Sequence, residues 1–321
     1  MNDSAYGQNG LMAVSLATKL RWFRRGAAAF ERTFPGLLVS RLGKDFGAAY
    51  VCPICDRAFT EGAVTAGVLT AEHVPPQSFG GRELLLTCKK CNNDAGTLLD
   101  AHARRKEDLV EVMIRPPSKP LKVRVEHRGR KVNARLVASE TGWELKVVQR
   151  ANDPKAVTAF QGSGPPKAGE PISVDFVGNR FAELGGKMSW FRSGFLALFA
   201  TFGYRFSFDP ALAIVKRQIL SPESRLIYSF TIEIPQSLAW FDWRILEIPE
   251  PRCTGVVFGR YVMVYPHRGD VKFYERLEAQ IRSREDRSPS TVTAQSFELV
   301  DHEPLFGYDV TELDRWSASD G

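Results

Sequence analysis

Four of the five cysteines could hold a metal ion. They form two Cys-x-x-Cys pairs, Cys52/Cys55 and Cys88/Cys91, with 32 residues between the pairs. Each pair places two thiolates on one tight turn, and four thiolates are a common tetrahedral ligand set for structural Zn²⁺. Redox or chance pairing is the alternative. Cys253 stands apart, as a small buried residue often does. The spacing predicts one structural zinc ion.

The segment between and after the pairs carries groups suited to hydrolysis. Glu72 and His73 lie between the two pairs, and Asn92 and Asn93 directly follow Cys91. Phosphodiester hydrolysis needs a base to deprotonate water and a cation to neutralise charge on the phosphate. An imidazole with a pKa near 6.5 is largely neutral at cellular pH and can accept that proton.

These motifs resemble the HNH endonuclease family. The shared pattern is an acidic residue, a His, a nearby Pro, a Gly-Gly, and then Cys-x-x-Cys followed at once by Asn. The run from Glu72 to Phe79 also resembles the HNH segment of the RNA-guided CRISPR nucleases. The resemblance implies a ββα-metal module in which Glu72 and Asn92 hold a catalytic Mg²⁺ or Mn²⁺ and His73 is the general base.

Each of these residues also has a structural alternative. His73 could be an ordinary hydrogen-bonded histidine. Asn92 or Asn93 could cap the helix that follows. Asn93 and Asp100 are secondary candidates for the catalytic metal, because Asp100 lies seven residues after Asn93 and so on about the same helix face. An exposed helical carboxylate is the simpler reading of Asp100.

One position departs from the family pattern. Many members have an Asn about five residues before the third cysteine, where it holds the base in position, and this chain has Glu83 there. Either a backbone carbonyl orients the base, or Glu83 does so, or the site is weakened.

Positive charge is concentrated directly after the motifs. The segment from Arg104 to Lys131 contains ten basic and four acidic residues, and the predicted helix from Met12 to Phe30 is basic on one side. Both segments are expected to flank the active site and follow phosphates, with a solvated surface as the alternative. Double-stranded DNA is the expected partner, and a protein partner or a homodimer would also fit.

Composition limits the class of protein. The chain has 321 residues, 44% of them apolar and 25% charged, and a net charge of +6. No apolar run approaches the roughly 18 residues that a membrane span needs. Lys19 and Arg21 interrupt the stretch where a signal peptide would be apolar. We expect a cytoplasmic protein that does not enter a membrane.

The remaining pattern predicts an α+β fold, with a small zinc-stabilised HNH module and a larger mixed C-terminal domain with antiparallel strands. The expected ranges are a basic helical segment at 1–45, the module at 46–110, the domain at 111–285 and a polar tail at 286–321. Within the domain we expect the following elements: a meander of three strands at 121–127, 131–138 and 143–149; a loop at 151–171; an apolar helix at 188–202; a helix opened by Asp209-Pro210; strands at 226–234 and 256–265; and a charged helix at 271–284.

Together these features predict a metal-dependent endonuclease, in which the HNH module cuts and the C-terminal domain selects the target or reports a signal. A bacterial defence or mobile-element setting would suit it. Two alternatives stay open. One is a zinc module that binds nucleic acid without cutting it, and the other is a toxin or defence effector that a partner protein switches.

Overall fold

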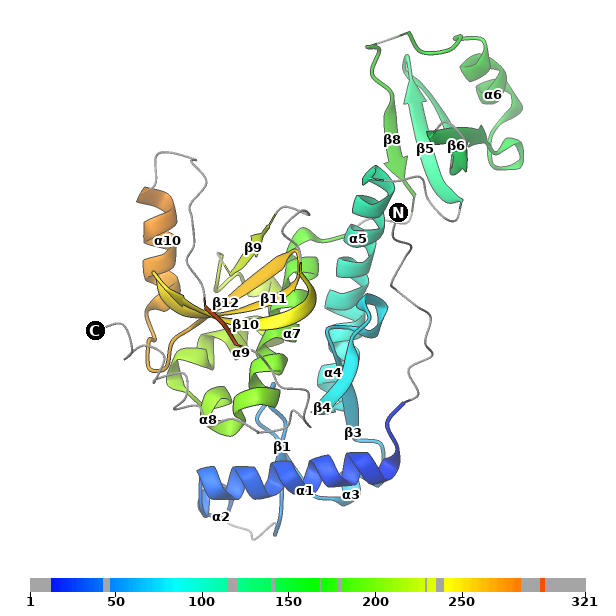
Figure 1. Cartoon of the computed structure of the whole chain (residues 1–321). Helices are drawn as coiled ribbons and strands as arrows, with labels where there is room; N and C mark the ends of the chain where they lie inside the picture. The colour runs from blue at the N-terminus through cyan, green and yellow to red at the C-terminus, as the bar shows by residue number, and fades with distance from the viewer. Residues whose placement is uncertain are drawn as a thin grey trace. The chain divides into compact units, whose positions relative to one another are not determined.

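Helices and antiparallel strand pairs build the chain, as predicted. The computed structural model describes residues 13–42, 47–114, 120–139, 142–167, 169–177, 181–228, 230–234, 240–283 and 295–297 (Figure 1). Two compact units are present: one spans residues 1–100 and 187–321, and the other spans 101–186. The second unit is therefore an insertion within the first. The domain ranges expected from the sequence stay a prediction.

The predicted zinc module begins the first unit. Strand β1 (Tyr50–Val51) pairs with β2 (Ala58–Phe59), the short helix α3 (Gly62–Thr65) follows, and β3 (Leu69–Val74) pairs with β4 (Arg82–Cys88). The 3₁₀ turn η1 (Gln77–Phe79) lies between β3 and β4.

The reversal from β3 to β4 depends on two glycines. Gly80 has a φ of 77°, a backbone conformation that residues with a Cβ rarely adopt. A Cβ on Gly81 would lie 1.5 Å from the carbonyl oxygen of Pro75, so any larger residue would collide with the backbone. The predicted role of this Gly-Gly pair in the turn therefore has a steric basis.

A helical run leaves β4 without a connecting loop. It consists of α4 (Lys89–Ala95), the π-helical turn η2 (Gly96–Asp100) and α5 (Ala101–Ile114). The N-cap of α4 is Cys88, so the interpretation of Asn92 or Asn93 as the helix cap was wrong. The third zinc-site cysteine ends the strand, and the helix starts at the next residue.

Helix α1 (Leu16–Thr33) covers this module, and its N-cap Ser15 accepts a hydrogen bond from the Thr18 amide. The predicted helix from Met12 to Phe30 is thus confirmed with shifted ends. Its buried side includes Phe23 and Phe30, which pack on aromatic rings of the first unit. After Pro35-Gly36 comes α2 (Leu37–Leu42).

The C-terminal part of the first unit contains helices and a five-stranded sheet of order β13-β10-β11-β12-β9. The helices are α7 (Glu183–Phe202), α8 (Tyr204–Ser207), α9 (Ala213–Leu220) and α10 (Phe273–Ser283), and the 3₁₀ turns η4 (Pro210–Leu212) and η5 (Pro222–Ser224) flank α9. The strands are β9 (Thr231–Glu233), β10 (Trp240–Pro249), β11 (Arg252–Gly259), β12 (Tyr261–Pro266) and β13 (Gln295–Phe297).

Two strand predictions need correction, and one strand was missed. The strand expected at 256–265 is a hairpin of β11 and β12, because Gly259 turns the chain with a φ of 55°. The strand expected at 226–234 is only β9. Strand β10 was not predicted. The Asp209-Pro210 helix start is confirmed, since Asp209 caps η4 through the Ala211 amide.

Aromatic packing joins α7 to this sheet, and Figure 1 shows the helix beside it. Phe191 stacks on Tyr265 of β12 with ring centroids 4.9 Å apart, and Trp190 stacks on Tyr261 at the same distance. The apolar helix predicted at 188–202 is confirmed, although α7 starts five residues earlier. No helix in the described ranges is long and apolar enough to cross a membrane.

The second unit contains a four-stranded antiparallel sheet of order β7-β6-β5-β8. The predicted meander is confirmed as β5 (Leu121–His127), β6 (Arg130–Ser139) and β7 (Gly142–Val147), and β8 (Ser173–Phe176) adds to β5. The loop expected at 151–171 was partly wrong. It contains the 3₁₀ turn η3 (Gln149–Ala151) and then α6 (Pro154–Gln161), which starts with an Asp153 cap and a first-turn Pro.

Candidate metal and catalytic site

The four predicted zinc ligands lie together. The Sγ atoms of Cys52, Cys55, Cys88 and Cys91 are all within 4.8 Å of one another, and none forms a disulfide. The sulfurs of Cys55 and Cys88 are 3.7 Å apart. Thiolates at about 2.3 Å from a tetrahedral Zn²⁺ would be separated by about 3.8 Å. The donor set and its spacing therefore fit a structural zinc ion.

One arginine favours the thiolate form at two of the four cysteines. The Arg57 guanidinium donates to the Cys55 sulfur at 3.4 Å and to the Cys88 sulfur at 3.3 Å. The pKa of the Cys55 thiol is lowered to about 6, chiefly by hydrogen bonding with Cys52 and with a smaller contribution from Arg57. A site of four thiolates around Zn²⁺ carries net negative charge, which this arginine offsets.

Residues distant in sequence fasten the first cysteine pair. The Tyr204 hydroxyl donates to the carbonyl of Val51 at 2.8 Å and accepts from its amide at 3.1 Å. The buried Lys216 ammonium lies 2.6 Å from the Asp56 carboxylate. The C-terminal half of the first unit therefore holds the cysteine turn in place.

Glu72 is buried on β3, with 4% of its surface exposed. Its carboxylate accepts two hydrogen bonds from Arg192, at 3.1 Å to Oε1 and 2.7 Å to Oε2, and Oε2 also accepts one from Thr87 at 2.7 Å. Sequence reasoning missed Arg192, which lies on α7 and is 1% exposed. A single Arg inside an otherwise apolar helix was the available signal, because a buried charge needs a partner.

Asp100 belongs to the same buried network. Its Oδ1 accepts a hydrogen bond of 2.6 Å from Ser189 of α7. Burial raises the pKa of Asp100 and the nearby charge of Glu72 adds to the rise, while Arg192 and the Ser189 hydrogen bond lower it. The structure places Asp100 toward α7 and Arg192. Asp100 and Asn93 were expected to share a helix face because they are seven residues apart. The π-helical turn η2 lies between them and changes this spacing around the helix.

His73 follows Glu72 across an irregularity in the hairpin. Glu72 pairs with Leu85 and His73 with Glu83, so Leu84 is an extra residue on β4. Such bulges re-aim side chains and are common beside active sites. His73 is half-buried, whereas Glu72 is buried. Within the described residues, His73 has no hydrogen-bond partner.

Asn92 is held against β3. Its Nδ2 donates to Thr70 Oγ1 at 3.1 Å and to the carbonyl of Ala71 at 3.3 Å. A carbonyl can only accept, so this contact identifies Nδ2 and leaves Oδ1 as the amide's remaining polar atom. The side chain of Asn93 is exposed, and it makes no hydrogen bond within the part of the chain that the structure describes.

Glu83 lies opposite His73 in the β3–β4 register, but its carboxylate is engaged elsewhere. Oε2 accepts a hydrogen bond of 2.6 Å from the amide of Val14, which precedes α1. The structure thus gives Glu83 a role in attaching the start of α1 to β4.

Many charges of the predicted basic segments are locally paired. Arg24 of α1 binds Glu61 at 2.7 Å, and in the second unit Arg104 binds Asp108 at 2.8 Å and Arg128 binds Glu170 at 2.6 Å. Arg115 and Lys119 lie outside the described residues. The two segments belong to different units, and their expected position around His73 stays a prediction.

A row of cations crosses one face of the sheet in the second unit. Lys122, Arg135 and Lys146 are directly opposite one another on β5, β6 and β7, so they share a face, and all three are exposed. Arg124 lies two residues from Lys122 on that face. Like charges directly opposite are unfavourable in a sheet, so this arrangement needs a reason beyond folding.

Comparison with known proteins agrees with the motif. Residues 52–108 match the family model described as HNH endonuclease. No curated protein and no solved structure matches the chain. The matched segment begins at the first zinc-site cysteine and includes the second pair and the helix after it. A match to this family indicates a nuclease or a nucleic-acid-binding role. Through residues 52–108, the chain therefore contains a segment that is similar to the HNH endonuclease family.

Proposed function

We propose that the chain is a metal-dependent endonuclease that hydrolyses the phosphodiester backbone of double-stranded DNA. The observation that carries the proposal is the attachment of Asn92 to β3 beside the Glu72-His73 pair, in a hairpin and helix joined by the cysteine cluster. This attachment holds an amide oxygen, a carboxylate and an imidazole on two adjoining elements.

The available oxygen atoms fit a hard cation such as Mg²⁺ or Mn²⁺. A carboxylate has about four acceptor positions, and three donors occupy those of Glu72, which leaves one on Oε1. Asn92 Oδ1 and Glu72 Oε1 would hold the cation, and waters and the phosphate would complete its shell. When bound, the cation neutralises charge on the scissile phosphate and the leaving oxygen.

The chain's own residues divide the remaining work. His73 accepts the proton of the attacking water at a ring nitrogen. Arg192 fixes both oxygens of Glu72, and Asp100 with Ser189 supports Arg192 in turn. Asn93 has no role in this assignment.

The first test is incubation of the purified protein with plasmid and Mg²⁺ or Mn²⁺, with and without EDTA. We expect cutting that EDTA abolishes. Replacing His73 with Ala should lower the cleavage rate about 10²–10⁴-fold, the usual contribution of a general base, while zinc content, folding and DNA binding stay nearly unchanged. Normal cutting by His73→Ala would show that another group is the base.

Asn92 and Asn93 provide a matched pair. Asn92→Ala removes the proposed ligand oxygen, so cleavage should require more Mn²⁺ or Mg²⁺. Asn93→Ala changes the neighbouring exposed residue and should cut like the wild type. Equal behaviour of the two variants across a metal titration would contradict the assignment of Asn92.

One observation favours a second function, a zinc module that binds nucleic acid without cutting. Glu72 is buried and Arg192 binds both of its oxygens, so the charge of this carboxylate already has a partner without a cation. A protein that binds plasmid but leaves it intact under every metal condition would select this function.

A further inference from the structure

The sheet of the second unit has an apolar face that its one helix covers only in part. Helix α6 has eight residues and is about 12 Å long, whereas four strands span about 14 Å and the ten-residue β6 is about 33 Å long. The described residues of the chain after α6, at 162–167 and 169–172, pass over the rest of this face. A cavity of about 370 Å³ remains beneath them.

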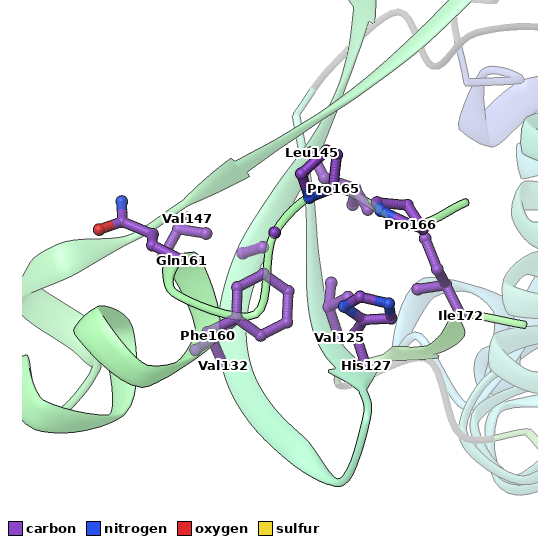
Figure 2. Close-up of a pocket in the computed structure, with 12 residues that line it drawn as sticks. Val125, His127, Val132, Leu145, Val147, Phe160, Gln161, Pro165, Pro166 and Ile172 are labelled. Carbon is purple, nitrogen blue, oxygen red and sulfur yellow. The ribbon is translucent and has the colours of Figure 1, made fainter. Parts of the chain in front are cut away.

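The cavity is lined almost entirely by apolar side chains, and Figure 2 shows them around one space. Buried residues of β5 and β6, including Val125, Val132 and Ala134, line it with Phe160 of α6. Pro165 and Pro166 belong to the covering segment. The amide of Gln161 points away from this space in Figure 2. The lining therefore offers shape and apolar area, with few polar groups.

His127 is the polar group within this lining. It is 3% exposed, and its ring lies edge-on to Phe160 with centroids 6.3 Å apart. Nδ1 is 3.4 Å from the Ser163 hydroxyl. Nε2 is 3.3 Å from Glu170 Oε1, but the geometry there does not make a hydrogen bond. A buried imidazole nitrogen without a good hydrogen bond is unfavourable, and a ligand could satisfy it.

The covering segment is fastened rather than free to collapse into the cavity. Arg128 donates to the carbonyl of Ser163 at 2.5 Å and to both oxygens of Glu170, at 2.6 and 2.8 Å. Arg130 donates to the carbonyl of Ala159. Arg128 belongs to the β5–β6 turn, and Arg130 is the first residue of β6. Adjacent prolines stiffen the segment between these contacts.

The turn itself departs from the usual sequence preference. Arg128 has a φ of 51° and Gly129 one of 72°, as in hairpin turns that favour Asn-Gly or Gly-Gly. An Arg in this left-handed conformation is unfavourable for the backbone, but only a long cationic side chain reaches Ser163 and Glu170. Local strain of this kind is typical of sites where geometry serves a function.

We propose that this cavity is a binding site for a small uncharged aromatic compound with one hydrogen-bonding group that faces His127. Its volume lies in the range of small-molecule sites, with room for on the order of a dozen non-hydrogen atoms. Flat rings suit the faces of Phe160, Pro165 and Pro166. A charged ligand would lose its hydration without gaining a free counterion. This site is independent of the proposed nuclease activity.

The test is titration of the full-length protein, labelled at the Val and Leu methyl groups, with indole followed by NMR. Saturable shifts at Val125, Val132 and Leu145, with a Kd below about 1 mM, are expected. Benzoate should bind at least about tenfold more weakly, because its charge would be buried. Absence of shifts at these methyls up to the solubility limit of indole would overturn the proposal.

Two variants locate the binding. Ala134→Phe fills the cavity and should abolish the shifts, while Ala138→Phe, on the exposed end of the same strand, should retain them. Wild-type affinity in Ala134→Phe would refute the site. If that variant fails to fold, the variant His127→Leu tests whether the compound binds in this cavity. It should weaken indole about tenfold and leave toluene, which has no polar group, unchanged; unchanged indole binding would refute the role of His127.

Discussion

At the scale of single residues, the Glu72–Arg192 pair joins the catalytic motif to a helix 120 positions later in the chain. Both side chains are almost fully buried, so each charge depends on the other. Removal of one partner from such a pair is strongly destabilising, whereas replacement of both with apolar residues is often tolerated.

Arg192→Met should therefore lower the free energy of unfolding by about 3–5 kcal/mol, because it leaves the Glu72 carboxylate buried without its partner. The double variant Glu72→Met, Arg192→Met should recover most of this loss in denaturant unfolding. Two single losses that simply add in the double variant would show that the pair does not act as a unit.

The double variant also distinguishes a metal-binding role of Glu72 from a purely structural one. The folded double variant should bind DNA but need more Mn²⁺ or Mg²⁺ for cleavage if Glu72 holds the cation. Cleavage with the wild-type metal requirement would make Glu72 purely structural.

At the scale of elements, the two cysteine turns and the β3–β4 hairpin have little core of their own. Zinc is expected to supply much of their stability, since binding energy at a structural zinc site is also folding energy.

Metal analysis should find one zinc per chain. Cys88→Ser should lose that zinc and unfold the module, seen as a loss of protection of the β3 and β4 amides from hydrogen exchange. Cys253→Ala is the matched control, because Cys253 is also buried but lies outside the cluster. Full zinc content in Cys88→Ser would contradict the four-cysteine site.

The basic sheet face of the second unit, defined by Lys122, Arg124, Arg135 and Lys146, predicts a contact with the phosphate backbone. The triple variant Lys122→Gln, Arg135→Gln, Lys146→Gln should weaken DNA binding and reduce the log–log salt slope by about 2.7, at about 0.9 per phosphate on duplex DNA.

Removal of the negative charge of Glu144, on β7 with Lys146, should have the opposite effect on DNA binding. Glu144 lies 3.3 Å from Lys146, so Glu144→Gln should free that lysine and strengthen binding slightly. An unchanged salt slope in the triple variant would remove this face from the nucleic-acid interface.

At the scale of the whole molecule, the HNH module is completed by residues beyond the insertion. Arg192, Tyr204 and Lys216 all contact it from α7, α8 and α9. Within the insertion, the segment from β5 to β8 begins and ends at one place, because the Val177 amide donates to the Lys122 carbonyl at 3.0 Å.

We therefore predict that residues 47–110 alone will not fold stably with zinc, whereas the full chain with 122–177 replaced by a short Gly/Ser linker will. For the fragment and for the linker variant, zinc content measures whether the cysteine site forms, and the sharpness of thermal unfolding measures whether folding is cooperative. A cooperative, zinc-loaded 47–110 fragment would contradict the dependence of the module on the C-terminal residues.

The amino-acid sequence by itself was sufficient for features encoded over short distances. The Cys-x-x-Cys pairs, the Gly-Gly turn, the meander after Pro120 and the Asp-Pro helix start each depend on neighbours along the chain, and the structure confirms them. Asp153-Pro154 has the same pattern at the start of α6, so this helix is also encoded locally.

Tertiary structure alone decided which distant charges meet. The motif indicated that Glu72 was special, but its neighbours in sequence contain no sign of Arg192. The contact between Ser189 and Asp100 likewise depends on how α7 packs. The insertion at 101–186 is also defined only by the tertiary structure, in which the segments before and after it form one unit. Local patterns specify turns, caps and ligand spacing, whereas a buried charge obtains its partner from packing between segments that the sequence separates widely.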